Sequence, residues 1–280
     1  MKITILGSGT STGIPEYKCQ CDTCQDARIY GSKNYRSRTS IHVEITTSDN
    51  IKHLQFDVGP NFIDQIDRCQ IDRIDAVIYT HCHADHISGL GGILDKHNAL
   101  TIGAQADIHR LPKLDKYVRA GDEFSFQGQT GKIFDVSGHT IGHIALYIPA
   151  QNILFSGDSL MALGCGRLFE GSAAQMWNSL SRLLALPDTT KICSGHEYTE
   201  NNASFALSID PKNRDLIKRS DEVKKTRRKN LFTVPSQLGL EKKTNPFLRP
   251  FDENIRKNLN MLGSTDVEVF RKIRTLKDNF

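Results

Sequence analysis

The chain has 280 residues, of which 38% are hydrophobic and 24% charged, with 21 Gly, 9 Pro and a net charge of +4. This composition is that of a globular protein and excludes collagen-like, coiled-coil and strongly disordered chains. The longest apolar runs, near Asp75–Tyr79 and Asn152–Phe155, are far shorter than the roughly 20 residues of a membrane span, so we expect no membrane association.

The first 170 residues are rich in short β-branched or alternating apolar runs separated by glycine turns, which predict strands with a few interspersed helices. The predicted strands are Lys2–Leu6, Ser40–Thr46, His53–Asp57, Ala76–Tyr79, Lys132–Val136, Ile144–Ile148 and Ile153–Phe155, and the predicted helices are Asn61–Cys69 and Gly89–Asn98.

After Gly171, apolar residues recur with helical spacing, and prolines mark the boundaries between the predicted helices. The predicted helices are Ser172–Ala185, Asn201–Ile209, Asn213–Lys229 and Val267–Lys277. The patterning therefore predicts an α/β domain over residues 1–171 and a mainly helical domain over residues 172–280. Residues 211–280 contain 18 Lys and Arg against 9 Asp and Glu. Such a basic segment is typical of a solvated helical face, and it can also attract an anionic partner or substrate. It lacks the interleaved aromatic and basic residues of nucleic-acid binders, so we expect no nucleic-acid partner.

Seven cysteines are present, an odd number, and three of them lie within Cys19–Cys24. The N-terminal residues lack the pattern of a secretory signal, and they read instead as a strand and a turn. Both observations disfavour a disulfide framework and indicate thiols or metal ligands in a reducing compartment. We therefore expect a cytoplasmic protein.

The strongest chemical signal follows the predicted strand Ala76–Tyr79, where His81, His83, Asp85 and His86 lie within six residues. Three imidazoles and a carboxylate packed this closely repel one another when protonated and need many partners when neutral. A bound cation resolves both problems, and these ligands suit zinc, iron or manganese. Three further ligand-type residues stand beside a glycine just after a predicted strand: His139, Asp158 and His196.

Together these residues resemble the two-metal site of the metallo-β-lactamase superfamily. The resemblance implies an αββα sandwich with two divalent metal ions, most often zinc, at one edge. It also implies that His81, His83 and His139 bind the first metal, that Asp85, His86 and His196 bind the second, and that Asp158 bridges the two. The last of these ligands, His196, would follow the predicted catalytic domain. Two residues outside this set have structural interpretations, Cys82 as a small filler and His143 as a hydrogen-bonded neighbour of the ligands.

The second half of the chain resembles glyoxalase II, the hydroxyacylglutathione hydrolase family. The similarity is carried by residues 164–171, 195–199, 233–236, 245–249 and 274–280. It implies hydrolysis of a glutathione thioester by a metal-activated hydroxide, with Asp85 and Asp158 as catalytic ligands. The positions that would hold glutathione are Arg167, Tyr198, Arg274 and Lys277, whereas Phe169 stands where some members have Tyr.

The first third resembles phosphodiesterases of the same superfamily that act on cyclic ribosyl phosphates. The similarity is carried by residues 6–15, by Cys19, Cys21 and Cys24, and by residues 56–60. This resemblance makes a metal-dependent phosphodiesterase the alternative to the glutathione thioester hydrolase. Three thiols at this spacing also suit a structural zinc with one further ligand, for which His42 or His109 are the alternatives.

Overall fold

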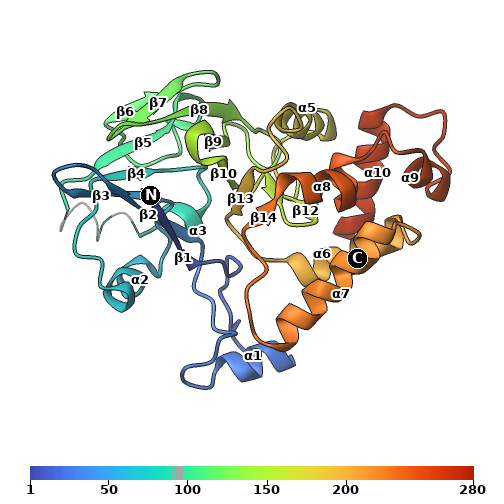
Figure 1. Ribbon diagram of the computed structural model, residues 1–280, viewed down its shortest axis with the longest axis horizontal. Helices are drawn as coiled ribbons and strands as arrows, with labels where there is room; N and C mark the ends of the chain where they lie inside the picture. Colours follow the sequence, from blue (N-terminus) through green and yellow to red (C-terminus); the bar gives the residue numbers. More distant parts are fainter. Residues whose placement is uncertain (90, 92–96) are drawn as a thin grey trace. The chain divides into compact units, whose positions relative to one another are not determined.

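The computed structural model describes residues 1–89, 91 and 97–280, and it divides into two compact units. Unit 1 is Met1–Phe134 and unit 2 is Asp135–Phe280, and Figure 1 follows their elements along the chain. The division after residue 134 separates two parts of the chain that are each compact. The predicted boundary after residue 171 instead marks a change from mainly strands to mainly helices. The boundary at residue 171 stays a prediction.

Unit 1 contains a six-stranded sheet in the order β1-β2-β3-β4-β5-β6. The first three strands pair antiparallel, and β3 to β6 run parallel. The strands are β1 Lys2–Gly7, β2 Ser40–Thr46, β3 Ile51–Phe56, β4 Ala76–Ile78, β5 Leu100–Ala104 and β6 Lys116–Val118, followed by the hairpin of β7 Glu123–Phe126 and β8 Gln129–Asp135. Among the described residues of this unit, the helices are α1 Asp22–Ala27, α2 Phe62–Cys69, α3 Ala84–Ile87 and the 3₁₀ turn η1 Gln105–Asp107.

A hydrophobic core in unit 1 joins this sheet to helix α2. Val77 and Tyr79 lie two residues apart and therefore share a face of the sheet, whereas Phe62 and Ile66 lie four apart and share a face of the helix. All four side chains are buried in one cluster. This packing fixes the end of β4, from which the histidine-rich segment continues.

Unit 2 contains the strands β9 Ile144–Ile148, β10 Ile153–Gly157, β13 Lys191–Ser194 and β14 Ser236–Gln237, in the order β14-β13-β10-β9. β10 and β13 run parallel, and every residue of β9 and β10 is buried. A two-stranded hairpin, β11 Leu160–Met161 and β12 Gly164–Cys165, follows β10. The helices are η2 Pro149–Gln151, α5 Ala173–Leu183, α6 Thr199–Ile209, α7 Arg214–Arg228, α8 Leu238–Thr244, η3 Pro246–Leu248, α9 Glu253–Asn258 and α10 Asp266–Asp278.

The helix ends of unit 2 follow signals in the sequence. α5 begins with a capping box in which the Ser172 and Gln175 side chains each accept the other residue's backbone N–H, and α10 begins likewise at Thr265 and Glu268. Within the unit, α6 packs against α7 and α10 against α5, as Figure 1 shows. The helical C-terminal region is thus built from pairs of packed helices.

The predicted strands and helices correspond closely to observed ones, and β2 and β9 have the predicted bounds. The predicted helix over 89–98 falls largely outside the described residues. No element was predicted between residues 99 and 131, where the structure has β5, β6 and β7. These strands are short, and β5 contains Gly103, where a Cβ would lie 2.8 Å from a Leu111 methyl group. Among the described residues, no helix combines the length and apolar character that a bilayer span requires.

Candidate metal centre

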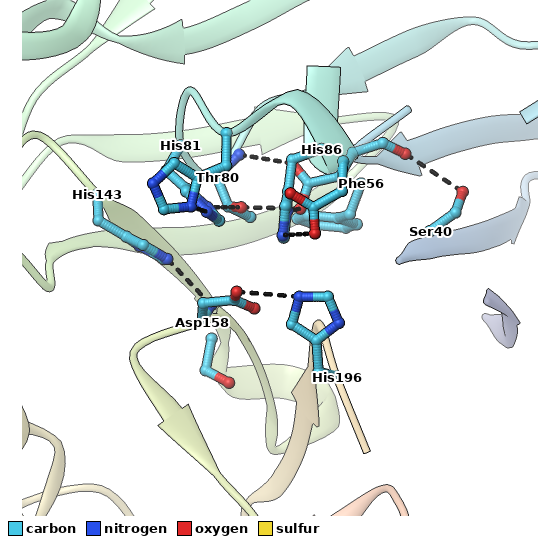
Figure 2. A network of polar contacts seen from close by, with 12 residues as sticks. Ser40, Phe56, Thr80, His81, His86, His143, Asp158 and His196 are labelled. Carbon is cyan, nitrogen blue, oxygen red and sulfur yellow. Dashed lines mark hydrogen bonds and ion pairs between the residues drawn. The ribbon is translucent and has the colours of Figure 1, made fainter. Parts of the chain in front are cut away.

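The histidine-rich segment of unit 1 begins at the carboxyl end of strand β4. Because β3 and β4 are parallel neighbours, the residues after each strand meet at one edge of the sheet. Asp57 follows β3, and the segment from Thr80 to His86 follows β4. Figure 2 shows Thr80, His81 and His86 at this edge.

The Asp57 carboxylate organises this edge. It accepts hydrogen bonds from the Thr80 backbone N–H at 2.8 Å and from the Thr80 hydroxyl at 2.8 Å, and it contacts His86 Nδ1 at 2.7 Å. An imidazole that donates Nδ1–H to a carboxylate carries its lone pair on Nε2, the form that binds metal. Asp57 therefore selects the His86 tautomer that has its lone pair on Nε2.

The imidazoles of unit 1 lie close together. His81 Nε2 and His83 Nδ1 are 3.2 Å apart, and the ring centroids of His81 and His86 are 4.0 Å apart. Asp85 Oδ2 lies 3.8 Å from His86 Nε2. A Cβ at Gly59 would lie 2.1 Å from the Asp85 carbonyl oxygen, so only glycine lets the loop after β3 approach this closely. Unit 1 thus brings together all four of its predicted ligands.

Unit 2 brings together its three predicted ligands around Asp158. Asp158 Oδ2 lies 3.1 Å from His196 Nε2 and 3.6 Å from His139 Nε2. All three side chains are buried. Figure 2 shows the contacts that join His143 and His196 to Asp158. His196 lies just after β13, Asp158 just after β10, and His139 in the loop before β9, so three strands of one sheet supply the group.

Backbone groups set the orientation of these ligands. His139 Nδ1 donates to the Arg167 carbonyl oxygen at 2.7 Å, which leaves the lone pair on Nε2, the nitrogen nearer Asp158. The Asp158 backbone N–H donates to His143 Nε2 at 3.0 Å, and His143 is completely buried. The prediction that His143 is a hydrogen-bonded neighbour of the predicted ligands is therefore confirmed.

Two of the predicted glutathione-binding residues share one carboxylate at the end of helix α10. Asp278 Oδ1 lies 2.8 Å from Arg274 Nη2 and 3.4 Å from Arg167 Nε. Arg274 is 6% exposed, and its Nη1 donates to the Cys165 carbonyl oxygen at 3.1 Å, whereas the Arg167 side chain is 57% exposed. Arg167 is thus the more accessible cation, and Arg274 also supports the hairpin β11–β12.

Lys277 lies one turn from Arg274 on the same helix. Its ammonium contacts Asn201 Oδ1 and lies 5.2 Å and 5.1 Å from the ring centroids of Phe205 and Phe280. Partial burial, reinforced by Arg274, lowers the pKa of Lys277 to about 8.

The remaining predicted contact residue, Tyr198, is half-buried, with its ring centroid 5.4 Å from that of the predicted ligand His196. Phe169 is 60% exposed and packs 5.3 Å from His139. Both aromatic side chains therefore lie beside predicted metal ligands.

The three N-terminal thiols form a separate group in unit 1. The Sγ atoms of Cys19, Cys21 and Cys24 lie within 4.8 Å of one another. His42, one of the two alternatives for a fourth ligand, contacts Gln55 and His53 instead. Hydrogen bonds from the Cys24 backbone N–H and from the Cys19 thiol lower the pKa of the exposed Cys21 thiol.

Asp57 was not predicted as a site residue. The available signal was a carboxylate directly after the strand His53–Asp57, but nothing in the sequence shows that this strand neighbours the one that leads to His81. That pairing is a long-range property of the sheet. The orienting role of the Arg167 carbonyl was also missed, because every residue has a backbone carbonyl and the residue type does not show which one accepts a hydrogen bond.

Comparisons with known families divide the chain at its last predicted ligand. The sequence model of the metallo-β-lactamase superfamily matches residues 56–196, and the model described as the C-terminus of hydroxyacylglutathione hydrolase matches residues 197–280. The first match confirms the predicted fold class. Residues 1–55 lie outside both matches, so the resemblance of this part to phosphodiesterases stays a prediction.

Individual relatives extend this similarity over most of the chain. A hydroxyacylglutathione hydrolase of Ruegeria pomeroyi is 48% identical over 244 residues, which cover 83% of this chain and 96% of that relative. One of Roseobacter denitrificans is 55% identical over 208 residues, covering 74% and 82%. Among solved structures, ETHE1 from Myxococcus xanthus matches with a TM-score of 0.56 at 22% identity, covering 85% of this chain and 86% of that one, which is a likeness of fold.

Proposed function

Because the chain belongs to the hydroxyacylglutathione hydrolase family, within the metallo-β-lactamase superfamily, we propose that it hydrolyses the thioester of S-2-hydroxyacyl-glutathione, such as S-lactoylglutathione. The products are glutathione and a 2-hydroxy acid. The observation that carries the proposal is 48% identity over 96% of the length of a relative with that name.

The histidine and aspartate clusters of this fold fit a binuclear metal site. We assign His81, His83 and His139 to one metal, Asp85, His86 and His196 to the other, and Asp158 to both. The donor chemistry supports this assignment, because Asp57 and the Arg167 carbonyl each occupy Nδ1 of a histidine and direct Nε2 to a cation. Imidazole and carboxylate ligands suit zinc, which we propose as the resident ion, and they also suit iron and manganese.

Held by these residues, two divalent cations would lower the pKa of a water molecule toward about 7 and would polarise the substrate carbonyl. Asp158 accepts a hydrogen bond from the attacking water and so holds it toward the carbonyl carbon. Water then replaces the sulfur on that carbon, the carbonyl–sulfur bond breaks, and glutathione leaves as a thiolate that takes up a proton. A thiolate is a good leaving group, so the reaction needs no strong general acid.

The buried thiols near the unit 2 ligands have properties that fit this direct hydrolysis. Burial raises the pKa of Cys165 to about 11 and that of Cys193 to about 12, so both stay protonated at neutral pH. Cys82 packs against the hydrophobic core of unit 1. A covalent acyl-cysteine intermediate therefore has no support from these three residues.

We assign recognition of the glutathione carboxylates to Arg167 and Lys277, with Tyr198 beside the ligand His196. The exposure of Arg167 and the half-buried ammonium of Lys277 support this assignment. Arg274 completes the set in the resembled family, and here it also holds Asp278 and the Cys165 carbonyl in place.

The test is an assay of purified zinc-loaded protein on two substrates. We expect hydrolysis of S-lactoylglutathione with kcat/KM of at least about 10⁴ M⁻¹s⁻¹, the lower end of ordinary enzymes. Bis-p-nitrophenyl phosphate should be cleaved at least about 100-fold more slowly. A preference for the phosphodiester, or no thioester hydrolysis by metal-loaded protein, would contradict the proposal.

A further inference from the structure

A buried carboxylate in the helical region, Glu241, contacts the hairpin β11–β12. It lies in α8, is 0% exposed, and accepts a hydrogen bond from the Leu163 backbone N–H at 2.8 Å. Leu163 occupies the turn of the hairpin with a φ of +57°, a conformation that a non-glycine residue adopts only when its surroundings hold it there. The Glu241 contact is therefore part of what holds this turn.

Side-chain amides satisfy the carbonyl groups of the same turn. Asn245 Nδ2 donates to the Gly164 carbonyl at 3.0 Å and to the Met161 carbonyl at 3.3 Å, while Asn202 Nδ2 donates to the Ala162 carbonyl at 3.0 Å. Asn245 also donates to Glu241 Oε2 at 3.1 Å. The hairpin turn is thus fixed by a polar network that reaches it from helices α6 and α8.

Both ends of this hairpin lead to predicted metal ligands. Asp158 lies two residues before β11, and Gly166 follows β12 at a point where a Cβ would lie 2.1 Å from the Asp158 carbonyl and 2.9 Å from His139 Nδ1. The next residue, Arg167, supplies the carbonyl that orients His139. A shift of the hairpin would therefore move an aspartate ligand and release a histidine ligand together.

Every partner of the Glu241 carboxylate is a donor. Oε1 accepts from Arg219 Nη2, and Oε2 accepts from Leu163 and Asn245. An amide of the same shape has a single acceptor oxygen, so Glu241→Gln would turn an NH₂ group toward a donor. The desolvation cost of a buried Arg–Glu pair can exceed its Coulombic gain, so the pair by itself is weak evidence for a stabilising role.

We infer that Glu241 is a positioning residue for the metal centre, acting through the Leu163 turn on Asp158 and His139. The inference rests on the proposed function for its catalytic readout. Its metal-binding readout needs only that the protein binds zinc.

The experiment compares Glu241→Gln with Asp210→Asn, a matched change in another buried Arg–carboxylate pair of unit 2. Asp210 accepts from Arg249 at 2.7 Å and from Asn213 at 2.9 Å, at the end of α6. Zinc affinity is measured by competition with a chelating indicator, folding by thermal melting, and kcat and KM on S-lactoylglutathione. We expect similar losses of melting temperature in the two variants.

Zinc affinity should fall about tenfold in Glu241→Gln alone, the low end of the effect of removing a partner that orients a metal ligand. The kcat should fall about tenfold with KM within about twofold. Equal zinc affinity and equal kcat in the two variants would overturn the inference. If wild-type protein binds zinc but does not hydrolyse the thioester, the proposed function fails while the affinity comparison still decides the role of Glu241.

Should Glu241→Gln fail to fold, Asn245→Ala tests the same network while keeping the Arg219–Glu241 pair. It removes the hydrogen bonds of Asn245 Nδ2 to the Met161 and Gly164 carbonyls and leaves that of Asn202 to Ala162. We expect zinc affinity to fall about threefold. Unchanged affinity in a folded Asn245→Ala protein would likewise overturn the inference.

Discussion

The two groups of predicted ligands are built in opposite ways. In unit 1, four ligands lie within six residues after one strand, and one carboxylate, Asp57, orients the histidine that ends the segment. In unit 2, three ligands lie up to 57 residues apart, and each depends on a different loop. The first group is specified locally, whereas the second is specified by a sheet, a hairpin and the helices that hold the hairpin. The second group should therefore be the more sensitive to changes at a distance.

The largest expected effect comes from removing Asp158, the predicted ligand that lies between His139 and His196 in unit 2. Asp158→Ala should lower kcat about 10³-fold, equivalent to about 4 kcal/mol, and should remove at least one zinc equivalent per chain. The reason is that Asp158 lies within 3.6 Å of both His139 and His196. Elemental analysis and steady-state kinetics measure both effects.

The control for Asp158 is Asp188→Ala, which removes an exposed carboxylate of unit 2 that pairs with Lys242. It should leave zinc content and kcat unchanged. Full activity in Asp158→Ala would contradict the two-metal assignment.

The next largest effect tests whether unit 1 depends on a single orienting group. Asp57→Asn should lower zinc affinity about 10- to 100-fold, because the amide no longer holds His86 as the Nε2 ligand. The control is Asp75→Asn at the opposite end of β4, where the carboxylate accepts from the His53 backbone N–H. Equal zinc affinity in both variants would show that the histidine segment orients itself.

A smaller effect separates substrate binding from metal binding in unit 2. Lys277→Ala should raise KM for S-lactoylglutathione about tenfold, corresponding to about 1.4 kcal/mol, with zinc content unchanged. Lys272→Ala, an exposed change on the same helix, is the control. A KM unchanged by Lys277→Ala would remove this lysine from the binding site.

The pH dependence of kcat/KM follows from the pKa of Lys277, which burial lowers to about 8. The side chain is charged below that pH and loses its attraction for a carboxylate as the pH rises through it. We therefore expect kcat/KM to fall above about pH 8 in wild type. In Lys277→Arg this fall should disappear, since a guanidinium keeps its charge. An identical profile in both proteins would assign the fall to another group.

The smallest expected effect concerns the three clustered thiols Cys19, Cys21 and Cys24. Cys21→Ser should remove one further zinc equivalent and lower the melting temperature by a few degrees, while kcat changes less than about twofold. Cys69→Ser, which alters another exposed cysteine of unit 1, is the control. Unchanged zinc content and melting temperature would show that the three thiols hold no ion.

The difference between the two ligand groups also explains what the sequence could predict. The segment from His81 to His86 was evident because its residue types are dense, and β2 and β9 were evident because apolar residues alternate or run continuously. The ligands of unit 2 were recognisable only as a series of strand ends beside glycines, after the first group had indicated a metal.

Residues that act through long-range pairing could not be predicted. Asp57 acquires its role from the β3–β4 register, and Glu241 lies 78 positions from the turn that it holds. The strands β5, β6 and β7 were not predicted because they are short and contain few consecutive apolar residues. Pairing with neighbouring strands determines their conformation.

The glycines that flank Phe169 have a practical consequence for directed evolution. A Cβ at Gly166 would meet the Asp158 carbonyl at 2.1 Å, and one at Gly171 would lie 2.6 Å from the Gly138 Cα. A mutant library should therefore leave both positions untouched. Phe169, between them, is 60% exposed and tolerates replacement on steric grounds. Randomising that single codon, with the flanking glycines retained, would show at little risk to folding how a side chain 5.3 Å from the His139 ring affects activity.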